Sequence, residues 1–123
     1  MRTTVRFTIG EHAVDTEFDD TQAARELLEA MPYSTMGGYW GAEFYFTMPV
    51  KLKPDDTACE VVESGTVAFW IEGSCLCLFW GATPVSRSGE CRAASDVIVI
   101  GRVRNPEVLP KLKDRAVTVE AFE

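Results

Sequence analysis

Hydrophobic and polar residues alternate through long stretches of this 123-residue chain, which is the pattern of strands that bury one face of a β-sheet. Residues 4–9 and residues 13–18 each alternate between apolar and polar side chains. Gly10-Glu11 lies between them, and a Gly-X pair suits a tight β-turn. The start of the chain therefore predicts an amphipathic β-hairpin.

A second hairpin is predicted in the middle of the chain, at residues 67–71 and 75–80. Both stretches are apolar on both faces and are joined at Glu72-Gly73-Ser74, so we expect them to form the most deeply buried part of the sheet. Gly101 lies inside a further predicted strand, which indicates a β-bulge or a close approach of another backbone segment. The further strands are predicted at 43–48, 97–103 and 116–122.

Two helices and one long loop complete the predicted elements. Residues 21–31 carry apolar side chains at helical spacing, which predicts a helix that Pro32 terminates. A second, short helix is predicted at 106–113. Residues 82–96, rich in Ser, Gly, Arg and Ala, are expected to form a loop. Together the elements predict a mainly β protein: a single domain over residues 1–123, built as a closed barrel of about eight mostly antiparallel strands.

The composition argues against partners that carry dense negative charge. Hydrophobic residues make up 46% of the chain and charged residues 25%, as in ordinary globular proteins. Nineteen acidic and twelve basic residues give a net charge of −7, and the basic residues are scattered, so neither nucleic acid nor a membrane surface is an expected partner. The chain has no apolar run long enough to cross a membrane and no secretory signal, so we expect a cytoplasmic protein.

The sequence lacks the residues that several common kinds of catalytic site require. His12 is the only histidine and lies at a hairpin corner, so neither a Ser-His-Asp nor a Cys-His arrangement is expected and no catalytic residue is assigned. One histidine and a single C-x-C do not make a set of metal ligands, and no Gly-rich phosphate-binding motif is present, so we predict neither a metal nor another cofactor. The cysteines are expected to be reduced and to pack as small hydrophobic residues; they are Cys59, Cys75, Cys77 and Cys91.

Glu43 and the aromatic residues around it in the sequence form the candidate site. Glu43 shares a strand face with Tyr45, and alternation alone favours a carboxylate that points to water. Alternatively, Glu43, Tyr45 and the nearest tryptophans line a concave face, where a desolvated carboxylate would have a raised pKa and could act as an acid or as a hydrogen-bond anchor. The tryptophans themselves, Trp40, Trp70 and Trp80, also suit simple packing in a core.

Three motifs along the chain carry a family resemblance. They read Trp40-Gly41-x-Glu43-Phe44-Tyr45-Phe46, Gly65-x-Val67-Ala68-Phe69-Trp70 and Leu76-Cys77-Leu78-Phe79-Trp80-Gly81, and Ala94-Ser95 extends the match. With these motifs the chain resembles the small prokaryotic cyclophilin-like proteins, a group catalogued as a domain of unknown function. The resemblance covers nearly the whole chain and implies a cyclophilin-like β-barrel with helices at its ends.

The residues that make cyclophilins prolyl cis–trans isomerases are not carried over by this resemblance. In active members an arginine donates to the prolyl nitrogen beside a glutamine and a proline pocket. Here Val97 stands in place of the pocket histidine, the only glutamine is Gln22 in the predicted helix, and residues 43–48 contain no arginine. Arg92, which precedes Ser95, is the one residue that could supply a guanidinium by another route.

Three functions remain open at this point. The leading hypothesis is a binding domain, without established catalysis, that holds a small molecule or short peptide in a groove on the barrel. A divergent peptidyl-prolyl isomerase that uses Arg92 or the aromatic pocket alone is the alternative, and it is the activity we would expect if the protein is an enzyme. A third function is a homo-oligomeric interaction module in which Tyr39 and Trp40 form the interface. The candidate ligand-binding residues are Trp40, Glu43, Tyr45, Trp70, Trp80, Arg92 and Ser95.

Overall fold

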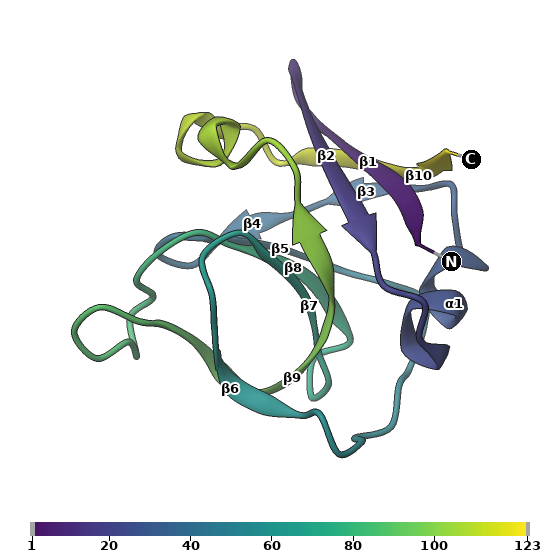
Figure 1. Ribbon diagram of the computed structural model, residues 1–123. Coiled ribbons are helices and arrows are strands. Elements are labelled where there is room, and N and C mark those ends of the chain that lie inside the picture. Colours follow the sequence, from purple (N-terminus) through teal and green to yellow (C-terminus); the bar gives the residue numbers. More distant parts are fainter. Residues whose placement is uncertain (1, 123) are drawn as a thin grey trace.

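Ten β-strands, one α-helix and one 3-10 helix make up the fold, a computed structural model that describes residues 2–122 (Figure 1). The helices are α1 (Gln22–Leu28) and the 3-10 helix η1 (Pro106–Lys111). The strands are β1 (Thr3–Ile9), β2 (His12–Phe18), β3 (Tyr33–Met36), β4 (Gly38–Tyr39), β5 (Glu43–Thr47), β6 (Cys59–Val62), β7 (Thr66–Trp70), β8 (Cys75–Phe79), β9 (Cys91–Val103) and β10 (Ala116–Phe122). Each pairing between these strands is antiparallel.

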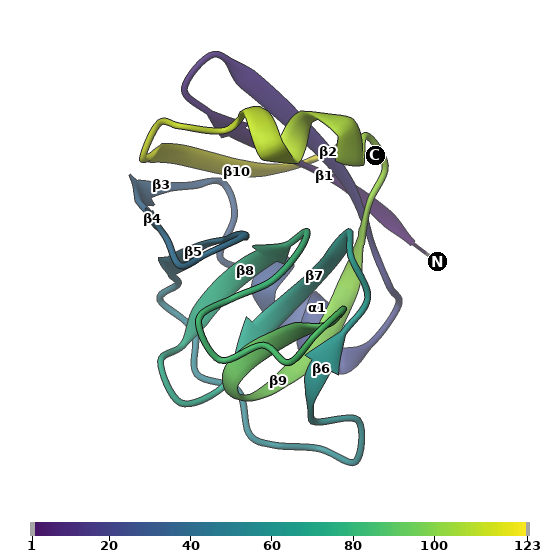
Figure 2. The same cartoon turned by 90° about the vertical axis from the view of Figure 1, so that its left-hand side faces the viewer.

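A single strongly curved sheet contains all ten strands. Its order is β3-β10-β1-β2-β9-β7-β8-β5-β4, and β6 pairs with β9 beside this path. Figure 2 shows the two halves of the fold, with β1, β2, β3, β10 and η1 in one layer and β5, β7 and β8 in the other. The long strand β9 runs from the second layer to the first and connects them.

The predicted closed barrel of about eight strands is wrong in strand number and in closure. The two ends of the sheet, β3 and β4, are joined by the chain at Gly37 and are not paired with each other by a strand ladder. The N–H of Gly37 still donates to the carbonyl of Arg115, 2.6 Å away, before the chain leaves β10 and pairs with β5. The extra strands, β3, β4 and β6, have only two to four residues each, which is too short for alternation to reveal them.

The first hairpin and the positions of both helices are confirmed, with shorter helices than predicted. β1 and β2 pair along their whole length around Gly10, whose φ of 60° favours glycine. Thr21 caps α1 by accepting a hydrogen bond from the N–H of Ala24 at 3.1 Å, but the helix ends at Leu28, short of the predicted residue 31. η1 is a 3-10 helix that ends two residues before the predicted boundary at 113.

β9 is the largest departure from the predicted elements. Residues 82–96 were expected to form a loop, but β9 begins at Cys91, so the loop spans only residues 82–90. The first half of β9 pairs with β6, the second half pairs with β7 and β2, and the strand bends visibly between them (Figure 1). The predicted role of Gly101 is confirmed: the β7–β9 register shifts there, and a Cβ on Gly101 would lie 2.1 Å from the carbonyl oxygen of Glu17.

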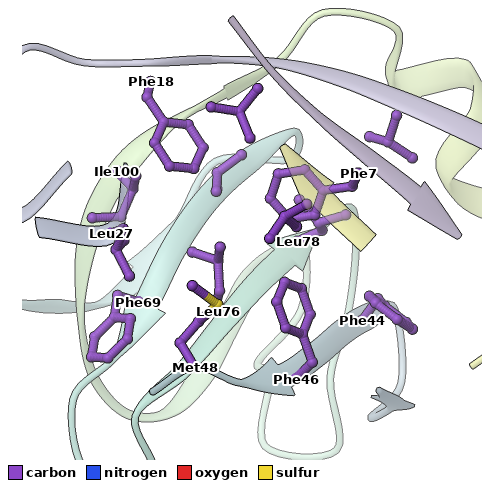
Figure 3. Packing of buried hydrophobic residues seen from close by; sticks show 14 of the residues in the cluster. Phe7, Phe18, Leu27, Phe44, Phe46, Met48, Phe69, Leu76, Leu78 and Ile100 are labelled. Atoms are coloured by element: carbon purple, nitrogen blue, oxygen red, sulfur yellow. The ribbon is translucent and has the colours of Figure 1, made fainter. Parts of the chain in front are cut away.

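β7 and β8 are apolar on both faces, as predicted for the middle hairpin, and they lie between β9 and β5 in the sheet. One face joins β1, β2, β10 and α1 in the main core, where side chains such as Phe7, Phe18, Leu27, Phe46 and Leu78 converge (Figure 3). The opposite face, called the second face below, is built from smaller side chains and packs against β6 and the first half of β9. The buried residues of the second face are Val62, Ala68, Cys75, Cys77, Phe79, Cys91, Ala93 and Val97. All four cysteines are free thiols.

Candidate functional site

A cavity of about 310 Å³ lies on the second face. This volume is near the lower end of the ~300–1,000 Å³ that small-molecule sites occupy. The cavity is lined by Trp40, Glu43, Tyr45, Trp70, Ala93 and Ala94. Four of the seven residues expected at the site are therefore brought together, and the complete lining comes from three separate parts of the chain, at residues 40–45, 70 and 93–94.

Strand alternation places Glu43 and Tyr45 on the second face, beside small residues of the neighbouring strands. On β5, Phe44 and Phe46 enter the main core, so Glu43 and Tyr45 turn to the second face. Tyr45 is directly opposite Cys77 of β8, and Cys77 is opposite Ala68 of β7. Directly opposed side chains in a sheet are neighbours, so the small Cys77 and Ala68 leave room beside the large Tyr45. The cavity itself is lined by the larger side chains of this face together with Ala93 and Ala94.

Glu43 is buried, with only 6% of its surface exposed, so the expectation that it points to water is wrong. The reason is that Ala93 and Ala94, in the part of β9 that was predicted as loop, form a wall of the cavity that contains it. No salt bridge within residues 2–122 reaches Glu43. Loss of hydration raises the pKa of Glu43 from an ordinary 4.5 to about 7.

Hydrogen bonding from the Cys77 thiol to the Glu43 carboxylate lowers the pKa of Glu43 against the larger effect of burial. Complete burial, followed by the negative charge of Glu43, raises the pKa of Cys77 well above its ordinary value, so the thiol keeps its proton. The Cys75 carbonyl oxygen, 3.6 Å from the Cys77 sulfur, is a second acceptor for that proton. The Glu43 carboxylate is thus paired with a neutral thiol, which is a weak hydrogen-bond donor, and not with a lysine or arginine.

Trp70 is held in position from two sides. Its indole Nε1–H donates to the hydroxyl of Ser95 at 2.7 Å, and this hydroxyl lies 3.4 Å from a carboxylate oxygen of Glu72. Behind the ring lies Gly73, where a Cβ would come within 2.1 Å of the indole. Ser95 therefore positions Trp70 and does not itself line the cavity.

Trp40 is fixed through its backbone at the turn between β4 and β5. Its N–H donates to the carbonyl of Glu43 at 2.9 Å. The turn continues through Gly41, which has a φ of 63°, a conformation that favours glycine. This turn brings the Trp40 side chain next to the carboxylate that follows it in the sequence.

Trp80 and Arg92, which the sequence also suggested, do not line the cavity. Trp80 packs against the main core. The guanidinium of Arg92 is held by two carboxylates, with Nε 2.7 Å from Glu90 and Nη1 2.9 Å from Glu60. Trp80 follows Leu76 and Leu78 at a spacing of two residues, so it lies on the same side of the sheet as these core residues.

Ala93, Ala94 and Cys77 were not expected at the site. Alanine carries no chemistry that marks it in a sequence, and only the family resemblance, through Ala94-Ser95, pointed to this segment. Cys77 was expected only as packing. Over residues 2–122 no group of three His, Cys, Asp or Glu side chains is arranged to hold a metal ion, and neither described helix is long and apolar enough to span a membrane.

The fold and the cavity define a class: small mainly β proteins in which one curved antiparallel sheet encloses a core and carries a pocket on its other face. The family model described as cyclophilin-like matches residues 3–120, and the chain belongs to the cyclophilin-like family. The solution structure of the hypothetical protein AF2241 from Archaeoglobus fulgidus is similar to this chain, with a TM-score of 0.81 and 32% sequence identity over 97% of this chain and 94% of that one. No curated protein matches the chain. The resemblance inferred from the three motifs is thus confirmed.

Proposed function

We propose that this protein is a binding domain that takes a small molecule or a short peptide in the cavity of the second face. The observation that carries the proposal is the composition of the cavity: three aromatic side chains surround one buried carboxylate. Ligand sites are commonly apolar and concave with a few polar groups that orient the ligand, and a titratable group with a perturbed pKa is a further mark of such sites.

The two other functions have less support. An isomerase that uses Arg92 needs a free guanidinium, and that of Arg92 is engaged by Glu60 and Glu90. An interface built on Tyr39 and Trp40 needs both side chains at the surface. Tyr39 is occupied within the chain, because its hydroxyl donates to the carbonyl of Asp114 at 2.7 Å, and Trp40 lines the cavity.

The indole N–H signals of the three tryptophans give a direct test of the binding site. A panel of small neutral, cationic and anionic compounds, together with the dipeptide Ala-Pro, would be titrated into ¹⁵N-labelled protein. We expect binders to shift the indole signals of Trp40 and Trp70, which line the cavity, and to leave that of Trp80 in place. Trp40→Ala should weaken the binding, whereas the matched control Trp80→Phe should not.

Two results would overturn the proposal. One is a panel in which no compound shifts the Trp40 or Trp70 signal. The other is binding that Trp40→Ala leaves unchanged, because the ligand would then occupy another surface.

A further inference from the structure

The charge that the cavity lining can carry favours a ligand of positive charge. Glu43 is the carboxylate in the lining, and no lysine or arginine contributes to the lining within the described part of the chain. The nearest arginine along β9, Arg92, is neutralised by Glu60 and Glu90. A bound carboxylate or phosphate would therefore have no basic partner and would face a buried carboxyl group.

The walls of the cavity are suited to a positive ligand. Trp40, Tyr45 and Trp70 come from the β4–β5 turn, from β5 and from the end of β7, so they approach the same space from different directions. The faces of aromatic rings carry negative electrostatic potential and attract organic cations, with tryptophan the strongest of them. The net charge of −7 adds a general attraction for cations approaching the protein.

We infer that this cavity selects an organic cation, a substituted ammonium group on a small molecule, with Glu43 as its counter-ion and Trp40, Tyr45 and Trp70 as its cage. The inference rests on the proposed function and specifies the class of ligand. A cation supplies the positive partner that Glu43 lacks, and its alkyl groups match the apolar walls. Substituted ammonium groups are weakly hydrated compared with a metal ion. Such a cation can therefore leave water and bind against the aromatic rings without needing oxygen ligands in place of its hydration shell.

Ligand affinity should then follow the ionisation of Glu43. The titratable groups that face Glu43 are Tyr45 on its own strand and the thiols of Cys75 and Cys77 on β8; β7 and β9 contribute Trp70, Ala93 and Ala94, which do not titrate. Burial keeps the pKa values of both thiols above their ordinary range, so Glu43 changes charge before they do. With a Glu43 pKa of about 7, roughly a tenth of the protein holds the ionised form at pH 6 and roughly nine tenths at pH 8. A cation that binds only the ionised form therefore loses about tenfold in apparent affinity from pH 8 to pH 6.

The experiment compares choline with 3,3-dimethylbutan-1-ol, a neutral compound of the same shape in which carbon replaces the ammonium nitrogen. Dissociation constants would be measured by tryptophan fluorescence at pH 6 and pH 8 for the wild-type protein, Glu43→Gln and the exposed-site control Glu11→Gln. We expect choline to bind more tightly than the alcohol and to weaken about tenfold at pH 6. Glu43→Gln should remove both the preference for choline and its pH dependence, and Glu11→Gln should keep both. Circular dichroism of each variant checks that it is folded.

The other outcomes separate this inference from the function on which it rests. If both compounds bind equally at both pH values, the cavity binds small molecules but does not select cations, and the inference is overturned. The same holds if neither compound binds while other members of the panel shift the Trp40 and Trp70 signals. If nothing in the panel binds, the proposed function fails and the inference fails with it.

Discussion

Replacing the buried Glu43 carboxyl group by an amide should stabilise the protein, and more so as the pH rises. In the native state the pKa of Glu43 is about 7, compared with 4.5 for an ordinary glutamate. Because the native pKa is the higher one, the folded protein holds this proton more tightly than the unfolded chain does. The stability that the group contributes is present below pH 4.5 and is lost as the pH rises through about 7. At about 1.4 kcal/mol for each pKa unit, the full loss is roughly 3 kcal/mol.

Glu43→Gln removes this loss because glutamine does not ionise. The assay is urea unfolding of both proteins at pH 5 and pH 8, from which the stability difference between variant and wild type is taken at each pH. We expect this difference to favour the variant by about 2.5 kcal/mol more at pH 8 than at pH 5. Glu11→Gln, which removes one carboxylate from an exposed turn, corrects for the change in net charge. A pH-independent difference would refute the reasoning, since it would mean that the Glu43 carboxylate ionises as readily in the folded protein as in the unfolded chain.

Three further predictions concern backbone contacts and catalysis. Gly101→Ala should destabilise the protein by more than about 2 kcal/mol in urea unfolding, because its Cβ would collide with the carbonyl oxygen of Glu17; a neutral effect would mean that β2 and β9 are farther apart than described. Gly73→Ala should displace the indole of Trp70 and weaken ligand binding while circular dichroism stays native, and unchanged Trp70 indole shifts would contradict this role for Gly73. A protease-coupled prolyl isomerase assay should show no acceleration that depends on Arg92, whose guanidinium is engaged by two carboxylates; acceleration that Arg92→Ala abolishes would instead place an active site at this arginine.

The sequence was informative wherever an alternating pattern or a continuous apolar run covered five residues or more. β1, β2, β5, β7, β8 and β10 were all predicted near their observed positions. The first half of β9 was not predicted as a strand, because residues 93–95 are Ala, Ala and Ser. These residues have low strand propensity and do not alternate in size. That segment folds as a strand because β6 pairs with it, a contact between residues far apart in the sequence.

At the site, too, the features set by neighbouring residues were predictable and those set by distant segments were not. Glu43 and Tyr45 were assigned to one strand face from β5 alone, and this assignment needed no knowledge of the rest of the fold. The burial of Glu43 could not be predicted, because the wall beside it comes from the strand segment that looked like loop. Trp80 was predicted at the site because it is a tryptophan, but it lies on the core side of the sheet with Leu76 and Leu78.

The small side chains of the second face also bear on how β7 and β8 find the correct register during folding. In most antiparallel sheets a slip of one residue turns an apolar face toward water, and this penalty selects the correct pairing. β7 and β8 lack most of that penalty, because a slip would exchange one apolar face for the other. Size must then select the register: Phe69 and Leu76 fill the main core, whereas Ala68 and Cys77 do not. A larger residue at Ala68 or Cys77 would therefore act twice, by crowding the buried cluster of the second face in the folded protein and by weakening the distinction between the correct hairpin and its slipped form.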